Sequence, residues 1–174
     1  MKGVIVNCLE ELVRTKFGKG KWEEALEMSG IPKNSIFLPS QDIDDRTVMS
    51  VVKSVCSVLE ITINQIADAF GEYWMTGYAP RIYKTYFRGK NTAKEFLLSM
   101  DNVHDLTTNN IPNARPPKFE FEWENDNNLV MKYTSQRSMM DFMVGLIKGV
   151  GKYYNEDLEI SQLGSNRVRI VFSS

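Results

Sequence analysis

The sequence predicts an α+β fold, in which a helical N-terminal subdomain packs on a C-terminal antiparallel sheet of about four strands with a long helix. Apolar residues recur at helical spacing through the first two thirds of the chain. Strict alternation of apolar and polar residues begins near residue 118. The 174 residues have ordinary globular composition, and no internal repeat or linker interrupts them, so we expect one domain over residues 1–174.

Four helices are expected in the N-terminal part. The first covers about residues 2–17 and ends at Gly18, and a short second helix around Trp22 stops at Gly30 and Pro32. The third carries a valine-rich apolar face between about residues 48 and 56. The fourth covers about 62–74, where Gly71, Gly77 and Pro80 interrupt the pattern beside a cluster of aromatic residues.

Three aspartates, Asp42, Asp44 and Asp45, precede the third helix. They do not form a calcium loop, because Arg46 stands where the third ligand belongs and no glycine follows it. We expect them to cap the helix N-terminus.

The C-terminal part mixes helices and strands. One helix is expected over about 92–110, with Met100 and His104 on its inner face. A hairpin follows, with strands over 118–124 and 129–135 around an Asn-rich turn. A long amphipathic helix over about 139–154 precedes two further strands, over about 157–162 and 167–172.

Composition excludes several classes of function. The formal net charge of -1 provides no polybasic footprint for nucleic acid. A single histidine, His104, excludes multi-histidine metal sites and HExxH zinc hydrolases. Cys8 and Cys56 are too few and too far apart for a disulfide framework, and are expected to be small apolar side chains in a reducing cytoplasm. Without a signal peptide or a membrane-spanning apolar run, we expect a soluble, cytoplasmic protein.

Motifs for common enzyme chemistry are missing. GKGK at 18–21 is not a P-loop, and Gly149 and Gly151 lie late in a helix rather than after a strand. No nucleophile elbow accompanies His104. Catalysis is therefore not expected.

Two features remain, and each is ambiguous alone. A lone histidine on an apolar helix face, such as His104, is commonly a core side chain. Strand alternation places Tyr133, Ser135 and Arg137 on one face, where they would form a clamp for a carboxylate or phosphate. The alternative is a set of exposed polar residues where a strand ends and a helix begins. Together, the two features suit haem, whose iron accepts a proximal histidine and whose propionates need a clamp.

Over essentially its whole length the sequence resembles the haem nitric oxide/oxygen binding (H-NOX) domains, a family that includes the haem domain of soluble guanylate cyclase. The resemblance runs through the motifs MKGVIVNCLEELV, FGEYW (70–74), MDNVH (100–104), ARPPKFEF (114–121) and YTSQRSMMDFMVGLIKGVGKYY (133–154).

The resemblance implies non-covalent haem b between the two parts of the fold, with His104 as the proximal iron ligand. Tyr133, Ser135 and Arg137 would hold the propionates, and Pro117 would press on the macrocycle and distort it. The other positions that the resemblance places around the haem, from either side of it, are Ile5, Leu146, Phe142, Trp74, Tyr78 and Met100.

The resemblance also bears on the gas. Members that hold O2 stably have a distal tyrosine where this sequence has Phe142, and Leu9 and Trp74 replace that tyrosine's polar or indole partners. Without this donor a polar bound O2 loses a hydrogen bond, so we expect NO and CO binding and no stable O2 complex. Tyr78 offers an alternative donor. An O2 sensor, a haem enzyme and a haem-free carrier of apolar ligands remain the alternative functions.

By the same resemblance, NO would weaken the bond between iron and His104, the haem would relax against Pro117, and the helix carrying His104 would shift. No effector domain is expected after residue 174. The signal would then pass to a separate partner, a histidine kinase or a cyclic-di-GMP enzyme.

Overall fold

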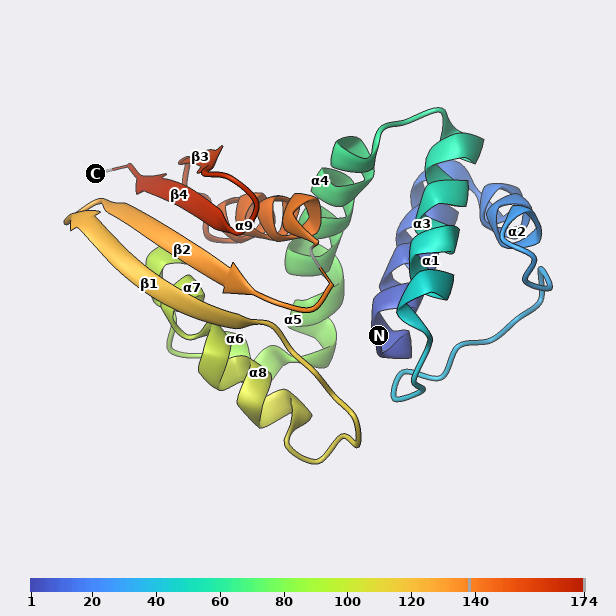
Figure 1. Ribbon diagram of the computed structural model, residues 1–174, viewed down its shortest axis with the longest axis horizontal. Helices are drawn as coiled ribbons and strands as arrows, with labels where there is room; N and C mark the ends of the chain where they lie inside the picture. The colour runs from blue at the N-terminus through green and yellow to red at the C-terminus, as the bar shows by residue number, and fades with distance from the viewer. Residues whose placement is uncertain (138, 174) are drawn as a thin grey trace.

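In the computed structural model, which describes residues 1–137 and 139–173, three N-terminal helices form a group set beside a larger α+β part (Figure 1). The N-terminal helices are α1 (Gly3–Phe17), α2 (Lys19–Met28) and α3 (Asp45–Leu59). The helices that follow are α4 (Ile63–Tyr73), the π-helix η1 (Trp74–Tyr78), α5 (Ala79–Ile82), α6 (Lys84–Phe87), α7 (Ala93–Leu98), α8 (Met100–Thr108) and α9 (Met140–Tyr154). The strands are β1 (Lys118–Asn125), β2 (Asn128–Thr134), β3 (Leu158–Gln162) and β4 (Arg167–Phe172).

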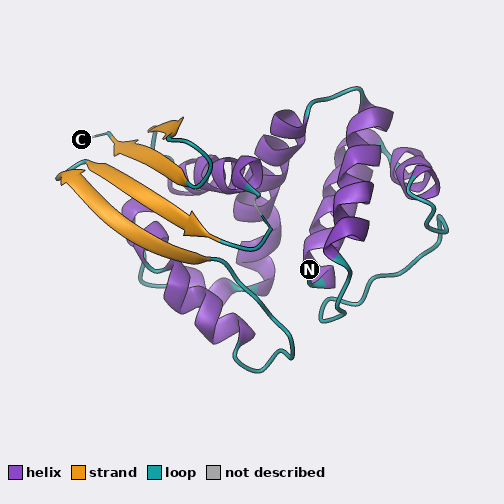
Figure 2. Cartoon of the chain, in the orientation of Figure 1, coloured by secondary structure: helices purple, strands orange, loops and turns teal. Residues whose placement is uncertain are grey.

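The four strands form one antiparallel sheet in the order β1-β2-β4-β3 (Figure 2). The predicted α+β class, the helical N-terminal part and the antiparallel sheet with its long helix are thus confirmed. Of the three aspartates expected to cap α3, Asp44 does so, since its carboxylate accepts hydrogen bonds from the backbone N–H groups of Arg46 and Thr47, whereas Asp42 pairs with Lys2.

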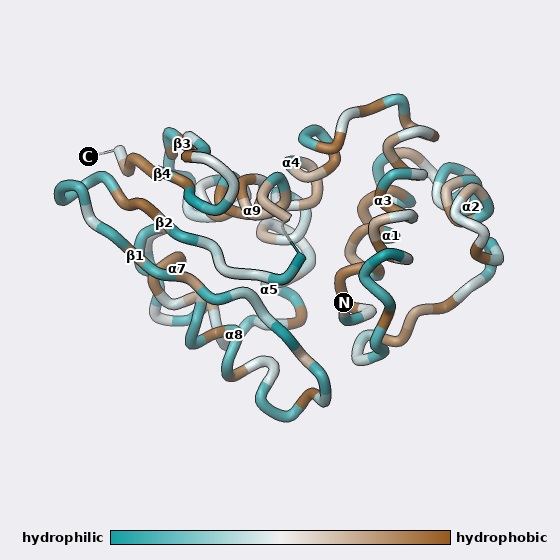
Figure 3. The backbone as a smooth tube through the Cα atoms, in the orientation of Figure 1, coloured by the Kyte–Doolittle hydropathy of each residue, from teal (hydrophilic) through white to brown (hydrophobic). Residues whose placement is uncertain are grey.

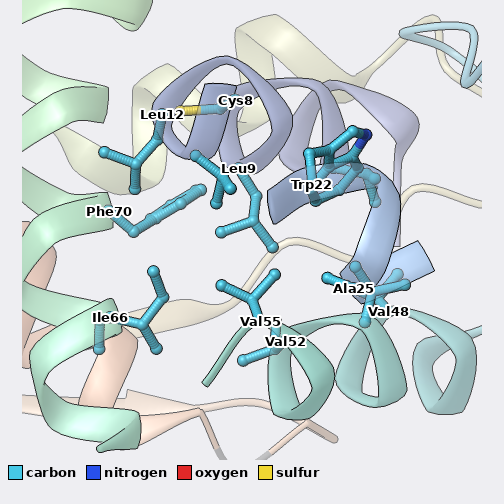
Figure 4. Close-up of a cluster of buried hydrophobic side chains, with 14 of the residues drawn as sticks. Cys8, Leu9, Leu12, Trp22, Ala25, Val48, Val52, Val55, Ile66 and Phe70 are labelled. Carbon is cyan, nitrogen blue, oxygen red and sulfur yellow. The ribbon is translucent and has the colours of Figure 1, made fainter. Parts of the chain in front are cut away.

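Two hydrophobic clusters hold the fold. The first joins α1–α3 to one side of α4, and in Figure 4 Phe70 of α4 points toward Leu9 and Leu12 of α1. The second lies between the sheet and helices α7 and α9, and the tube in Figure 3 is hydrophobic along much of β4 and hydrophilic at the turn between β1 and β2. Half-buried Trp74 packs against both clusters, so it lies at their junction.

The region around residue 74 corrects one prediction. Gly71 does not interrupt α4: it lies inside the helix, where an added Cβ would fall 2.0 Å from the carbonyl oxygen of Gly145 in α9. Gly71 therefore permits two helix backbones to touch. The chain then continues helically through η1 and α5 past Gly77 and Pro80.

The predicted single helix over 92–110 is also wrong, because it divides into α7 and α8 at Ser99. The Ser99 hydroxyl donates to the Phe96 carbonyl at 2.7 Å, and its backbone N–H donates to the same oxygen at 3.0 Å. A serine that bonds its own preceding turn competes with the regular helical ladder. His104 therefore lies on α8, a helix separate from α7.

Among the described residues, no single helix is long and apolar enough to cross a membrane; only the strongly bent pair Asp45–Leu59 and Ile63–Ile82 has the length and composition together.

Candidate functional site

His104 lies on α8, half-buried, and its Nδ1 atom is sealed from solvent. No hydrogen bond of normal geometry reaches this nitrogen from the described residues. Burial lowers the pKa of His104, although the Pro117 carbonyl and the carboxylate of Asp101 oppose the shift. The ring is therefore neutral at physiological pH, which is the form that binds a metal.

Aromatic rings continue from His104 into the sheet. The His104 and Phe119 ring centres are 5.7 Å apart, and Phe119 lies 6.1 Å from the ring of Tyr133. Pro117 is half-buried immediately before β1. The structure thus brings His104, Pro117 and Tyr133 into one neighbourhood where α8 meets the first two strands.

Two polar contacts fasten α8 to β1. The Asp101 carboxylate accepts from the backbone N–H of Phe119 at 3.1 Å, and Lys118 pairs with Asp105 at 2.6 Å. Asp101 and Asp105 lie on either side of His104 in α8. A displacement of the imidazole together with α8 would therefore also move the start of β1 through these two contacts.

Strand alternation predicts that the three clamp residues share one face of a strand. In the structure they do not. β2 ends at Thr134, so strand alternation does not extend to Ser135 and Arg137, which lie in the following turn. There the Ser135 hydroxyl oxygen accepts the backbone N–H of Arg137 at 3.2 Å. Tyr133 is buried at the strand end, and its hydroxyl makes no hydrogen bond within the described residues.

Arg137 is held from two sides. Its Nε donates to Asp45 Oδ2 at 2.9 Å, and its Nη1 donates to the carbonyl of Arg115 at 2.6 Å. Among the described residues Nη2 has no partner, so this nitrogen can still donate to an added anion.

Asp45 is expected from the sequence only as a helix cap, and the structure gives it a larger role. Its other oxygen accepts from the N-terminal amine at 2.6 Å. Burial raises the pKa of Asp45, but the hydrogen bonds from the amine and from Arg137 outweigh it, so the pKa lies below its usual range. Asp45 therefore joins the N-terminal helices to the turn that carries the clamp, a contact across 92 residues of sequence that no local pattern indicates.

The residues expected on the other side of the cofactor lie in or against the first cluster. Phe142 and Tyr78 are buried members of it, and Ile5, Trp74 and Leu146 pack against it half-buried. Met100 instead packs against the second cluster, with Tyr133. The predicted set is therefore divided between the two clusters that meet at Trp74.

An aromatic row runs through this apolar side. Ring centres are 5.5 Å apart for Phe142 and Phe70, 5.8 Å for Phe70 and Trp74, and 5.5 Å for Trp74 and Tyr78. Phe142 has no hydrogen-bond donor, and Leu9, in the same cluster, is fully apolar and buried. Burial raises the pKa of Tyr78, so its hydroxyl stays protonated.

One polar link beside this row was not predicted. The Glu11 carboxylate of α1 accepts from Arg81 at 2.7 and 2.9 Å and from the Tyr73 hydroxyl at 2.8 Å. The Arg81 guanidinium also lies over the Tyr78 ring, 5.3 Å from its centre. Tyr73 and Arg81 are 62 and 70 residues from Glu11 in the sequence, so no local motif predicts these contacts.

These residues fit haem. A haem iron brings four ligands in its own macrocycle and needs a further protein ligand, and the neutral imidazole of His104, whose buried Nδ1 atom has no partner among the described residues, can supply it. A guanidinium with a spare N–H suits a propionate, and buried aromatic and aliphatic side chains suit the macrocycle. Within residues 1–137 and 139–173, no group of three or more His, Cys, Asp or Glu side chains is arranged to hold a metal ion.

Similar solved structures share the fold along the whole chain. A Cs H-NOX mutant with 4-cyano-L-phenylalanine at site 5 matches with a TM-score of 0.87 and 27% identity, covering 100% of this chain and 97% of that one. An oxygen-binding H-NOX domain related to soluble guanylate cyclases, in its oxygen complex, matches with a TM-score of 0.83 and 28% identity, covering 100% and 96%.

Curated relatives agree. The soluble guanylate cyclase gcy-34 of Caenorhabditis elegans is 28% identical over 166 residues, 92% of this chain and 24% of that protein. The soluble guanylate cyclase gcy-32 of the same organism is 26% identical over 174 residues, 97% and 25%. The chain thus spans about a quarter of the length of these relatives. A family model described as haem-NO-binding matches residues 2–162. The chain therefore belongs to the haem-NO-binding family, the H-NOX domains of haem-based gas sensing that are related to soluble guanylate cyclases.

Proposed function

We propose that this protein is a haem-based nitric oxide sensor that regulates a signalling partner and is not itself an enzyme. The observation that carries the proposal is the neutral imidazole of His104, whose buried Nδ1 atom has no hydrogen-bond partner among the described residues, in a fold whose other cluster holds a donor-free Phe142. When bound, the haem would supply a ferrous iron that binds diatomic gases.

His104 would be the axial ligand, and the hydroxyls of Tyr133 and Ser135 with the guanidinium of Arg137 would hold the propionates of haem b. Pro117, which immediately precedes β1, would press on the macrocycle. Ile5, Leu146, Phe142, Trp74 and Tyr78 would pack on the distal side, and Met100 on the proximal side. The orientation of Arg137 is fixed before any propionate binds, because Asp45 and the Arg115 carbonyl already hold it.

NO and CO are the expected ligands. Phe142 excludes water from the distal side and donates nothing to a bound gas, which removes the support that a polar bound O2 needs. One observation favours an O2-binding sensor instead: Tyr78 is buried with a protonated hydroxyl that has no partner among the described residues. A related H-NOX domain is described as oxygen-binding.

The signal would leave through two contacts of this chain. α8 passes a displacement of His104 to β1 through Asp101 and Asp105, and Arg137 passes one to the N-terminal helices through Asp45. A ligand shifts such an equilibrium only by favouring one arrangement over the other. We propose a histidine kinase or a cyclic-di-GMP enzyme as the partner.

Absorption spectra of the reduced protein alone, with NO, with CO and with O2 test the proposal. We expect a Soret band, clear changes with NO and CO, and no persistent complex in air. His104→Ala should abolish the band, and His104→Gly should regain it with free imidazole. A persistent oxygen spectrum in the unmodified protein would favour the O2 sensor.

The same spectra distinguish a haem-free carrier and a haem enzyme from a sensor. A carrier of apolar ligands would show no Soret band, with or without His104. A haem enzyme would turn over peroxide or NO, which needs distal acid–base groups. Partner regulation by NO that is unaltered in imidazole-rescued His104→Gly would rule out transmission through α8.

A further inference from the structure

A groove of about 410 Å³ lies on the N-terminal helices, away from the predicted haem residues. Its walls come from α1, from α2 and from the segment 33–37 that follows α2. The proposed gas-sensing residues do not line this groove, so the proposed haem site does not explain it.

Trp22 lies at the base of this groove. The residue is only 1% exposed and packs in the first hydrophobic cluster, yet its indole N–H makes no hydrogen bond with any described residue. In Figure 4 the indole nitrogen lies on the side of the ring that faces away from Leu9 and Val55. Because Trp22 also lines the groove, its one polar atom is available there. An indole N–H without a protein acceptor can donate to an added ligand.

The charged side chains around Trp22 include three cations and two carboxylates. Arg14 and Lys19 are already paired with Glu10 at 2.7 Å and Glu23 at 3.2 Å, and all four side chains line the groove. Lys33 lines it too, but its partner Glu27, 3.7 Å away, does not. The groove therefore carries one positive charge in excess. The side chains of Asn34 and Ser35 make no hydrogen bonds within the described residues, so each can donate to a ligand.

An apolar edge borders these polar groups. Ile36 is 83% exposed, although its neighbour Phe37 packs half-buried against the first cluster. An isoleucine presented at the rim of a polar recess can cover an apolar side chain of a bound segment. The groove thus joins a site for one anion to a small apolar surface.

We propose that this groove binds an acidic peptide segment of the signalling partner, with a carboxylate on Trp22 Nε1 and Lys33 and an adjacent apolar side chain against Ile36. The identity of the partner as a signalling protein rests on the proposed function; the ligand chemistry rests on the groove. The position is suitable for regulation, because the N-terminal helices carrying the groove are joined to Arg137 by Asp45.

The test follows the three indole N–H signals by NMR in ¹⁵N-labelled, reduced, CO-saturated protein. The probes are the blocked peptide Ala-Glu-Leu-Glu-Ala and its matched control Ala-Gln-Leu-Gln-Ala. We expect the acidic peptide to shift the Trp22 signal saturably, while Trp74 and Trp123 serve as internal references. The glutamine peptide should bind roughly tenfold more weakly or not at all.

Lys33→Glu provides the matched variant, since Lys33 is exposed and its replacement leaves the core intact. It should weaken the acidic peptide by about tenfold, whereas Lys53→Glu, exposed on α3 and outside the groove, should change binding less than about twofold. Trp22→Phe should delete the shifted signal and confirm its assignment.

No saturable shift of the Trp22 signal, or equal binding of the two peptides, would overturn the proposal. Because the peptide assay does not depend on NO, the two proposals fail separately. Loss of the NO response with peptide binding intact contradicts only the proposed function, and the reverse result contradicts only the groove.

Discussion

At the residue scale, the site combines side chains whose polar atoms are satisfied by the protein with side chains whose polar atoms are not. Arg137 and Asp45 bind each other, while the Nδ1 atom of His104 and the hydroxyl of Tyr154 are buried without partners among the described residues. A buried polar atom without a partner is costly. Two cases can explain such an atom. In the first, a function uses the atom; in the second, the packing of the rest of the side chain outweighs the cost of the unpaired atom.

Phe142→Tyr tests the first case by adding a buried hydroxyl that a bound gas could use. Adding a hydroxyl on the distal side should convert the protein into one that forms a persistent O2 complex, measured by its absorption spectrum in air, because the hydroxyl supplies a missing donor. Without ligand the same hydroxyl should reduce the free energy of unfolding by about 1–3 kcal/mol. Phe70→Tyr is the matched control, since it adds a hydroxyl to the neighbouring ring and should lose stability without gaining O2 binding. A Phe142→Tyr protein that binds CO but no O2 contradicts the distal assignment.

Tyr154→Phe tests the second case. The Tyr154 hydroxyl is sealed against the second cluster, and its burial raises the pKa of Tyr154 to about 12. Removing it should leave the fold intact and increase the free energy of unfolding in urea by about 1 kcal/mol. Tyr153→Phe, at a side chain that is 37% exposed, should change it by less than about 0.5 kcal/mol. A clear loss of stability in Tyr154→Phe would mean that the hydroxyl does have a partner, such as a buried water.

At the element scale, a close contact between α4 and α9 is made through glycines. An added Cβ on Gly145 would fall 2.2 Å from the Ala67 carbonyl oxygen, and one on Gly149 would fall 2.2 Å from that of Gly71. This approach brings the ring of Phe142 on α9 to 5.5 Å from that of Phe70 on α4.

Gly145→Ala should therefore force α4 and α9 apart and reduce the free energy of unfolding by about 1–3 kcal/mol. The matched substitution Gly20→Ala in α2, where nothing lies within 4 Å of the added atom, should instead increase it by up to about 1 kcal/mol through helix propensity. Urea denaturation of both variants measures the difference. Equal effects of the two substitutions would show that the glycines are not required for close packing.

Elements are predictable from the sequence where one local pattern decides them. The strands and the long helix follow from alternation and helical periodicity, and the Asp44 cap follows from local chemistry. Predictions are wrong where a contact from another element or a side-chain hydrogen bond overrides the pattern. From the sequence alone Gly71 is predicted to interrupt the helix, whereas in the structure it allows close contact with α9. Ser99 ends α7 through its hydrogen bonds to Phe96, although the apolar face continues past it.

The residues of the candidate site likewise include some that the sequence indicates and some that it does not. His104 is conspicuous because it is the only histidine in the sequence, and Arg137 because it completes a motif. The strand alternation that predicts an alignment of Ser135 and Arg137 ends at Thr134. Asp45, Glu11 and Arg81 could not be assigned from the sequence, since their contacts join residues 70 to 92 positions apart.

At the scale of the whole molecule, two carboxylates of the N-terminal helices bind arginines in the rest of the protein. Asp45 binds Arg137, and Glu11 binds Arg81 and Tyr73. The Arg81 guanidinium lowers the pKa of Glu11 despite partial burial of the carboxylate, and the pKa of Asp45 is lowered as well. A carboxylate whose pKa is lowered by folding stabilises the fold above its unfolded pKa, near 4, and loses that effect as the pH falls further.

The double variant Glu11→Gln/Asp45→Asn should accordingly be less stable than the unmodified protein at pH 7, and the difference should narrow below about pH 4. At pH 7, amide hydrogen exchange should accelerate in α1–α3 and stay unchanged in the sheet, because none of the lost contacts lies within the sheet. High salt should reduce the difference, since both links are partly exposed. Glu120→Gln removes an ion pair confined to β1 and β2, so it should leave exchange in α1–α3 unaltered. Uniform acceleration over the whole chain in the double variant would instead mean that the N-terminal helices and the sheet unfold as one unit, which would leave no independent movement for a bound gas to control.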